Sequence, residues 1–263
     1  MICEDPLVKH FRKEYHISLV KQPNNGINLL DIYEKHDGYL HKVGHIENLF
    51  TTSKRVALPT AEKESQMVEM EESKTDKVEK RFALDPLSYF VEAFKGVLKA
   101  GFQSAFDNAH FMQYYMKNVR LKRIPILELQ EFLSTAKLQK TKNPNLEKDI
   151  KAGKYYVIVE LIRTNSLSFS AYDKNGKNLD LEASIKPLIS GNIDYNSDNS
   201  TKEKLSYKGR SYVTFGVVPA KILYNKKNDS YHINIDYKTP TLRDGKTQIE
   251  PLDVEEALVD FRG

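Results

Sequence analysis

The chain has 263 residues and a mass of 30.3 kDa, with 40% hydrophobic residues, 29% charged residues and a formal net charge of +4. A chain of this size and composition can bury a core, which excludes a disordered protein. No apolar run reaches the roughly 18 residues of a transmembrane helix, and the N-terminus, with Glu4 and Asp5, lacks a secretory-signal pattern. The single cysteine fits a reducing cytosol, and the seven scattered histidines predict no metal site.

The charge is unevenly distributed along the chain. Residues 250–263 contain five acidic residues and one arginine, so this segment carries a net charge of −4 and the remaining body carries +8. If the acidic segment were lost, the body would bind anionic membranes better, because each Lys or Arg near such a surface contributes about 1 kcal/mol. The alternative is that the acidic segment is simply a solvated tail.

The first half of the chain predicts short strands and helices. The expected elements are a helix begun by Asp5 and Pro6, a strand over 17–20 ended by Pro23, a hairpin over 29–43 turning at Asp37-Gly38, a helical turn over 46–50, a helix over 85–102, a strand over 111–121 and a helix begun by Pro125. Residues 59–81 are dense in charge, so they form either a mobile excursion or edge strands exposed on both faces. Residues 137–154 are basic and polar and are predicted to be a loop.

Residues 155–185 organise the second half. Apolar and polar residues alternate on both sides of an Asn175-Gly176 turn, which is the strongest short-range hairpin signal in a sequence. A half-buried hairpin in a soluble sheet is the commoner explanation. The second explanation is a membrane-inserting hairpin, because a membrane-crossing strand needs only about 9–11 alternating residues. Its apolar positions are Val157, Val159, Leu161, Leu167, Phe169, Ala171, Leu179 and Leu181.

The rest of the chain predicts a loop, two strand regions and a broken segment before the acidic end. Residues 187–204 have a loop composition, and residues 207–222 form a strand pair or one bulged strand punctuated by glycine. Residues 231–237 alternate as a strand, and residues 240–245 break the order.

No catalytic constellation is present. The sequence contains neither a glycine-rich phosphate loop nor a serine in a nucleophile elbow. Cys3 is a nucleophile in principle, but it lies in a terminus that frays unless it is docked. Basic loops with tyrosines match no nucleic-acid-binding module. We therefore expect no enzyme, no cofactor and no nucleic-acid partner.

The order of the segments resembles the bacterial gasdermins, a family of pore-forming defence proteins. The N-terminal match consists of ISLVKQP at 17–23, INLLD at 27–31 and YLHKVGHI at 39–46. The hydrophobic helix over 85–102 resembles the helix that follows the family's first hairpin. YKG at 207–209 and FGV at 215–217 resemble its late segment. The resemblance covers nearly the whole chain through motifs of low individual specificity.

The resemblance implies an α+β fold with a twisted central sheet, antiparallel or mixed, and flanking helices. It implies a pore-forming body over 1–238, a cleavable linker over 239–250 and an autoinhibitory C-terminal peptide over 251–263. In the family a protease, often caspase-like, removes the peptide, and the body assembles into a large ring whose hairpins refold into a transmembrane barrel. The implied role is antiphage defence. The intact protein is expected in the cytoplasm. The cleaved protein is expected to bind anionic lipids of the inner membrane, permeabilise that membrane and kill the cell.

The resemblance also gives roles to particular residues. Cys3 occupies the place of a cysteine that is palmitoylated in the family, and one acyl chain anchors only marginally without a second signal. The scissile region is Leu242, Arg243 and Asp244. The autoinhibitory contacts are Leu252, Val254, Leu258 and Phe261. Residues 54–84 are the weaker candidate for the first membrane hairpin, because their charges would have to face water.

Two alternatives stay open at this point. The tail is also compatible with an ordinary C-terminal element that is never cut. The whole chain is also compatible with a soluble ligand-binding or protein-binding module that has a stable mixed sheet and no membrane activity.

Overall fold

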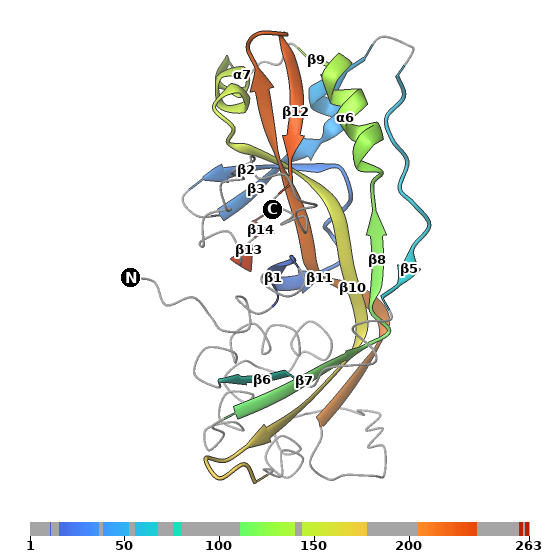
Figure 1. The fold of residues 1–263 in the computed structure, drawn as a ribbon, viewed down its shortest axis with the longest axis vertical. Coiled ribbons are helices and arrows are strands. Elements are labelled where there is room, and N and C mark those ends of the chain that lie inside the picture. Colours follow the sequence, from blue (N-terminus) through green and yellow to red (C-terminus); the bar gives the residue numbers. More distant parts are fainter. Residues whose placement is uncertain are drawn as a thin grey trace, which may run out of the picture.

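The computed structural model describes residue 11 and residues 16–36, 39–52, 56–67, 76–79, 111–139, 144–177, 205–235, 258–259 and 261–262. A 12-stranded sheet dominates this part of the chain, and its main path runs β13-β1-β11-β10-β2-β3-β14. Two long strands, β10 and β11, run the length of the molecule and connect an upper body that carries the helices with a lower body around β6 and β7 (Figure 1). The expected α+β class with a twisted mixed sheet is confirmed, since β13 and β14 pair in parallel and the other pairs are antiparallel.

The N-terminal strands form as their sequence predicts. β2 (Asp31–His36) and β3 (Tyr39–His45) make the expected antiparallel hairpin, and β2 also pairs with the start of β10. β1 (Ser18–Asn24) pairs with β11 on the other side of the sheet. The prediction that Pro23 ends this strand is wrong by one residue, because the chain re-pairs at Asn24 after a shift of register.

The sheet is built around β10 (Tyr155–Tyr172) and β11 (Leu205–Asn225). The two strands pair antiparallel from Tyr156↔Lys221 to Phe169↔Leu205, with three irregularities of register. β11 is therefore one bulged strand rather than a strand pair, although Gly209 and Gly216 interrupt its sequence. β12 (Ser230–Asn234) folds back onto the end of β11 as the predicted strand.

Helices cover the upper body. α2 (Ile46–Leu49) is the expected single turn, and α6 (Ile126–Thr135) begins after Pro125 and buries Leu129, Phe132 and Leu133. The side chain of Gln130 on α6 accepts a hydrogen bond from the Ile233 backbone N–H at 3.1 Å, which ties the helix to β12.

The prediction of a loop over residues 137–154 is wrong. β9 (Lys137–Leu138) pairs with β4 (Phe50–Thr51), and α7 (Pro144–Lys151) follows. α7 buries Leu146 and Ile150, which are four residues apart and lie on one helical face. The lysines and carboxylates between them dominate the composition and hide this short apolar stripe.

The charged segment and the strand that follows it form edge pairs where the structure describes them. β5 (Ser65–Gln66) pairs with β8 (Arg120–Arg123), and β6 (Asp76–Glu79) pairs with β7 (Phe111–Lys117). The strand predicted over 111–121 is divided into β7 and β8 at Asn118, whose φ of 54° lies in the left-handed region that asparagine tolerates. The helices predicted near Asp5 and over 85–102, and the loop over 187–204, lie outside the described residues.

Candidate functional site: the long strands and the C-terminal strap

β10 has an inner and an outer half with different neighbours. Its inner half pairs with β2 through residues 155–157 and with β8 through residues 160–163, within the core of the upper body. Its outer half, residues 166–172, pairs with β7 on one side. β11 lies along the other side of both halves as far as Phe169 (Figure 1). The outer half of β10 thus belongs to a four-stranded antiparallel sheet in the order β6-β7-β10-β11.

The register of this outer sheet separates apolar from polar positions. Residues directly opposite each other across paired strands lie on the same face of a sheet. The positions that share one face are apolar or aromatic except for Asp76 at the edge: Asp76, Val78, Met112, Tyr114, Met116, Leu167, Phe169, Ala171, Leu205 and Tyr207. The positions that share the other face are polar or tyrosine except for Phe111 at the end of β7: Lys77, Glu79, Phe111, Gln113, Tyr115, Lys117, Ser166, Ser168, Ser170, Tyr172, Ser206 and Lys208. The amphipathic alternation predicted for one strand therefore runs in phase across neighbouring strands.

A polar joint connects the outer sheet with the upper body. Asn118, between β7 and β8, donates from Nδ2 to Oδ1 of Asn165 on β10 at 3.2 Å. The buried hydroxyl of Thr164 accepts the backbone N–H of Ser166 at 3.1 Å and bonds to its carbonyl at 3.0 Å, across an irregularity of the β10–β11 register. The two long strands, β10 and β11, are thus both irregular at the point where the outer sheet joins the upper body.

The candidate membrane positions fall into separate environments. Val157, Val159 and Leu161 belong to the inner half of β10 and are at most 6% exposed in the core. Leu167, Phe169 and Ala171 occupy the apolar face of the outer sheet by register. Leu179 and Leu181 lie outside the described residues. Over Ser166–Phe169 the two neighbours of β10 are β11 and β7. Residues 179–183, the hairpin partner expected for this strand, lie outside the described residues.

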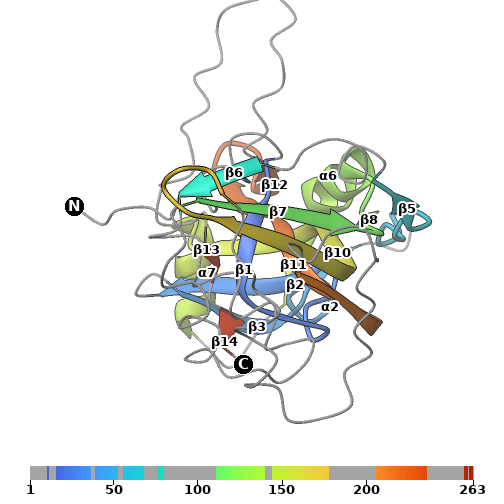
Figure 2. The same ribbon diagram turned by 90° about the horizontal axis from the view of Figure 1, so that it is seen from below.

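The C-terminal residues form two short strands, β13 (Leu258–Val259) and β14 (Phe261–Arg262), which we call the C-terminal strap. Each pairs in parallel with a strand of the main sheet. β13 extends the sheet beside β1 and β14 extends it beside β3, at opposite ends of the strand order (Figure 2). The Cα partners are Leu19↔Leu258, Val20↔Val259, Leu40↔Phe261 and His41↔Arg262. Because one residue separates β13 from β14, the strap joins the two edge strands of the curved sheet. Cys3, Leu242, Arg243, Asp244, Leu252 and Val254 lie outside the described residues.

An ionic clamp holds the charged segment against the sheet, a feature that the sequence analysis missed. Glu64 reaches Nη1 of Arg120 and Nη1 of Arg163 with its two oxygens, each at 3.2 Å. Glu62 bonds to Nε of Arg123 at 2.6 Å, and the guanidinium of Arg120 lies 4.1 Å from the ring centre of Tyr212. The basic run of β8 is the local signal for this clamp, but its acidic partners come from a distant part of the chain.

The described residues include no group of three His, Cys, Asp or Glu side chains placed to hold a metal ion. Burial raises the pKa of Tyr33, with Asp31 adding to the shift, and burial beside Glu34 raises the pKa of Tyr155. Both shifts keep a core tyrosine neutral. None of the described helices has the length and apolarity required to cross a bilayer.

Comparisons with known proteins agree with this fold. A profile of the Bacterial Gasdermin Family matches residues 20–232. Gasdermin bGSDM of Gillisia limnaea is 24% identical over 84% of this chain and 83% of its own length. Gasdermin bGSDM of a Desulfuromonadales bacterium is 22% identical over 96% and 88%. The structure of a bacterial gasdermin from Bradyrhizobium tropiciagri superposes with a TM-score of 0.60 at 14% identity, covering 97% of this chain and 95% of that one. Since the profile spans most of the chain, including the paired strands β10 and β11, the protein belongs to the Bacterial Gasdermin Family.

Proposed function

We propose that this gasdermin is a latent pore former that is activated when proteolysis within residues 239–250 releases the C-terminal strap. The observation that carries the proposal is the position of the strap, which pairs with both edge strands of the sheet, β1 and β3. An unpaired edge strand presents free N–H and C=O groups that template pairing with another chain. Release of the strap would expose two such edges at once, and a heterologous contact between edges generates a ring when the rotation closes.

The outer sheet supplies the membrane-inserting element of this proposal. Its apolar face, which contains Leu167 and Phe169 by register, would face lipid, and its polar face would line the pore. Backbone polar groups in a bilayer must be paired within the protein, so insertion requires lateral pairing between subunits. Residues 76–79, from the charged segment, already pair with β7 as an edge of this sheet.

The finer parts of the proposal come from the family. We propose that a caspase-like protease cuts near Leu242, Arg243 or Asp244, that palmitoylation of Cys3 assists membrane attachment, and that anionic lipids of the inner membrane are the target. The outcome would be permeabilisation and death of the cell as a defence against phage. The positive charge that remains when the acidic segment leaves supports the choice of anionic lipid.

The test is dye release from liposomes that contain anionic lipid. A recognition sequence for a specific protease is placed within residues 239–250, and leakage is measured before and after cleavage. We expect leakage only after cleavage. Protein without the inserted site, treated with the same protease, is the matched control and should release nothing. Equal leakage from cut and uncut protein would refute autoinhibition, and no leakage from either would favour a soluble binding module.

A further inference from the structure

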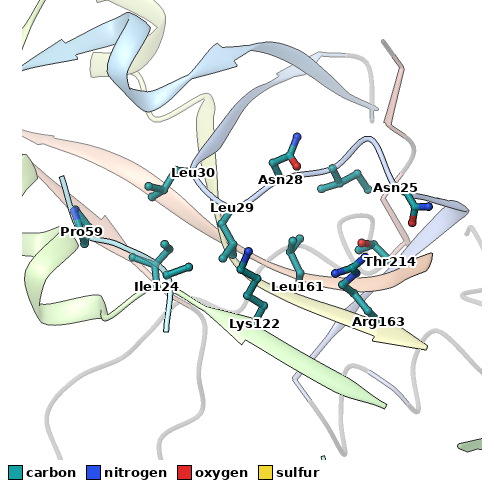
Figure 3. A pocket seen from close by; sticks show the side chains of 12 residues that line it. Asn25, Asn28, Leu29, Leu30, Pro59, Lys122, Ile124, Leu161, Arg163 and Thr214 are labelled. Atoms are coloured by element: carbon teal, nitrogen blue, oxygen red, sulfur yellow. The ribbon is translucent and has the colours of Figure 1, made fainter. Parts of the chain in front are cut away.

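A cavity of about 280 Å³ opens between the upper body and the charged segment, beside the loop that joins β1 to β2 (Figure 3). Its walls come from residues 25 and 27–30 of that loop, from residues 59 and 61 ahead of β5, and from strands β8, β10 and β11. The volume is close to the lower limit of small-ligand pockets, roughly 300 Å³. The cavity therefore suits a small metabolite, and its lining decides which kind.

Hydrogen-bond donors gather at one end of the cavity. Thr214 on β11 is paired across the sheet with Arg163 on β10 and with Asn24 on β1, so Arg163, Thr214 and Asn25 lie close together (Figure 3). Thr214 is only 1% exposed, and within the described part of the chain its hydroxyl makes no hydrogen bond. A buried hydroxyl costs free energy unless it is bonded, so this group is ready to bond to a ligand.

The wall of the cavity that β8 and β10 form carries an excess of positive charge. Lys122 on β8 lies opposite Leu161 of β10, lines the cavity, and forms no ion pair with any residue that the structure describes. The single carboxylate of Glu64 is shared between Arg163 and Arg120. Two arginines thus share one carboxylate, and Lys122 is a second cation of the cavity wall that Glu64 does not neutralise.

The opposite end is apolar. Leu30, Pro59 and Ile124 lie there, away from Arg163 and Thr214 (Figure 3). Leu30 and Ile124 are at most 4% exposed and belong to the core. A bare inorganic anion would fill only the charged end, whereas an anion with a short carbon body would fill both.

We propose that this cavity is a binding site for a small organic phosphate, a phosphomonoester. Such a group carries a charge of about −1.5 to −2 at neutral pH and offers three strong acceptor oxygens. An arginine fork, a lysine point charge and a hydroxyl are the donors that bind phosphate well. Arg163, Lys122 and Thr214 would hold the phosphate, and the apolar wall would contact the carbon body.

Ligand binding would stabilise the conformation described here. The cavity exists only while residues 59–61 and the β1–β2 loop lie against β8 and β10, because each contributes a wall. A ligand that binds one conformation shifts the population toward it. This holds whether or not the chain forms pores, so the site can be tested on the intact protein alone.

The experiment measures the melting temperature of the intact protein against increasing glycerol 3-phosphate, with glycerol as the uncharged control. We expect the phosphate to raise the melting temperature and glycerol to leave it unchanged. Lys122→Gln should bind about tenfold more weakly, as expected for one charge-assisted contact. Lys174→Gln removes the same charge from an exposed turn and should bind like the wild type.

Thr214→Val separates binding from folding, because it keeps the side-chain shape and removes a hydroxyl that has no bond to lose. It should melt at the wild-type temperature without ligand and respond less to glycerol 3-phosphate. Sedimentation with phosphatidylcholine vesicles that contain phosphatidic acid distinguishes the source of the phosphate. Lys122-dependent vesicle binding without a response to glycerol 3-phosphate would assign the site to a lipid headgroup. Equal responses of the two lysine variants, or no response to either probe, would overturn the proposal.

Discussion

Gly216 is a residue on which the packing of the central sheet depends, because the neighbouring part of the chain comes very close to it. Gly216 of β11 lies between Leu19 of β1 and Ile162 of β10 in the register. A Cβ added at Gly216 would collide with Cγ2 of Ile17, the residue just before β1, so this position requires glycine because the chain approaches closely there. Its signal in the sequence is a glycine inside a long strand, which predicts either a bulge or such an approach. Only coordinates distinguish the two.

Gly216→Ala should therefore destabilise the protein. Overpacking of a filled core costs about 1–3 kcal/mol, which lowers the melting temperature by several degrees. The measurement is the urea midpoint of the variant against the wild type. The control is the same substitution in an Ile17→Ala background, where the colliding methyl group is absent and the additional cost should shrink. An equal cost in both backgrounds would show that the contact with Ile17 is not the cause.

Two buried tyrosines predict the behaviour of the protein at alkaline pH. The pKa values of Tyr33 and Tyr155 are raised by burial from the ordinary value of 10.0. Above that pH the unfolded chain loses both phenolic protons while the folded chain keeps them, so the free energy of unfolding should fall as the pH rises. Below about pH 9 neither state ionises these groups, and this contribution should be constant. Urea midpoints across this range measure the slope, and Tyr33→Phe should reduce it.

Helices and strands with local sequence signals could be predicted, whereas contacts between residues far apart in the sequence could not. The Asp-Gly signal at 37–38 and Pro125 predicted a hairpin and a helix, and both elements are present, because turn and capping chemistry act over a few residues. α7 was missed because Leu146 and Ile150 are its only described buried residues. The pairing of Glu64 with Arg163 spans 99 residues of sequence. Such a contact depends on the register of β5, β8 and β10 together, which no local pattern encodes.

The ionic clamp should control the stability of the charged segment. Glu64→Gln leaves Arg120 and Arg163 opposite each other on neighbouring strands without their shared carboxylate. We expect the backbone N–H of Met67, which bonds to the Val119 carbonyl at 2.8 Å, to exchange several-fold faster by hydrogen–deuterium exchange. Glu62→Gln removes one more exposed pair, worth about 0.2–1 kcal/mol, and should have a smaller effect. A larger effect of the second variant would contradict this order.

The C-terminal strap pairs with both edge strands and so closes a sheet that would otherwise have two open edges. The sheet order places β1 and β3 at its two edges, and β13 and β14 cover them with a single intervening residue. The resemblance to the gasdermins implied a C-terminal peptide that docks on the body, whereas the composition of residues 250–263 alone was also compatible with a solvated tail. The simultaneous pairing with two edges was not predictable, because it requires the sheet to curve until those edges are one strap-length apart.

A disulfide between His41 and Arg262, which are Cα partners in β3 and β14, tests whether departure of the strap is the activating step. Paired strand positions fall within the distance that a disulfide spans. The His41→Cys, Arg262→Cys double variant is made with Cys3→Ala, so that no other thiol competes, and with the protease site in residues 239–250. After cleavage the oxidised protein should not release dye, because the strap stays tethered, and reduction should restore release. Arg262→Cys with Cys3→Ala is the matched control and should leak after cleavage in either redox state. Leakage from the cleaved, oxidised double variant would mean that backbone scission is sufficient, and that the paired edges do not restrain the sheet.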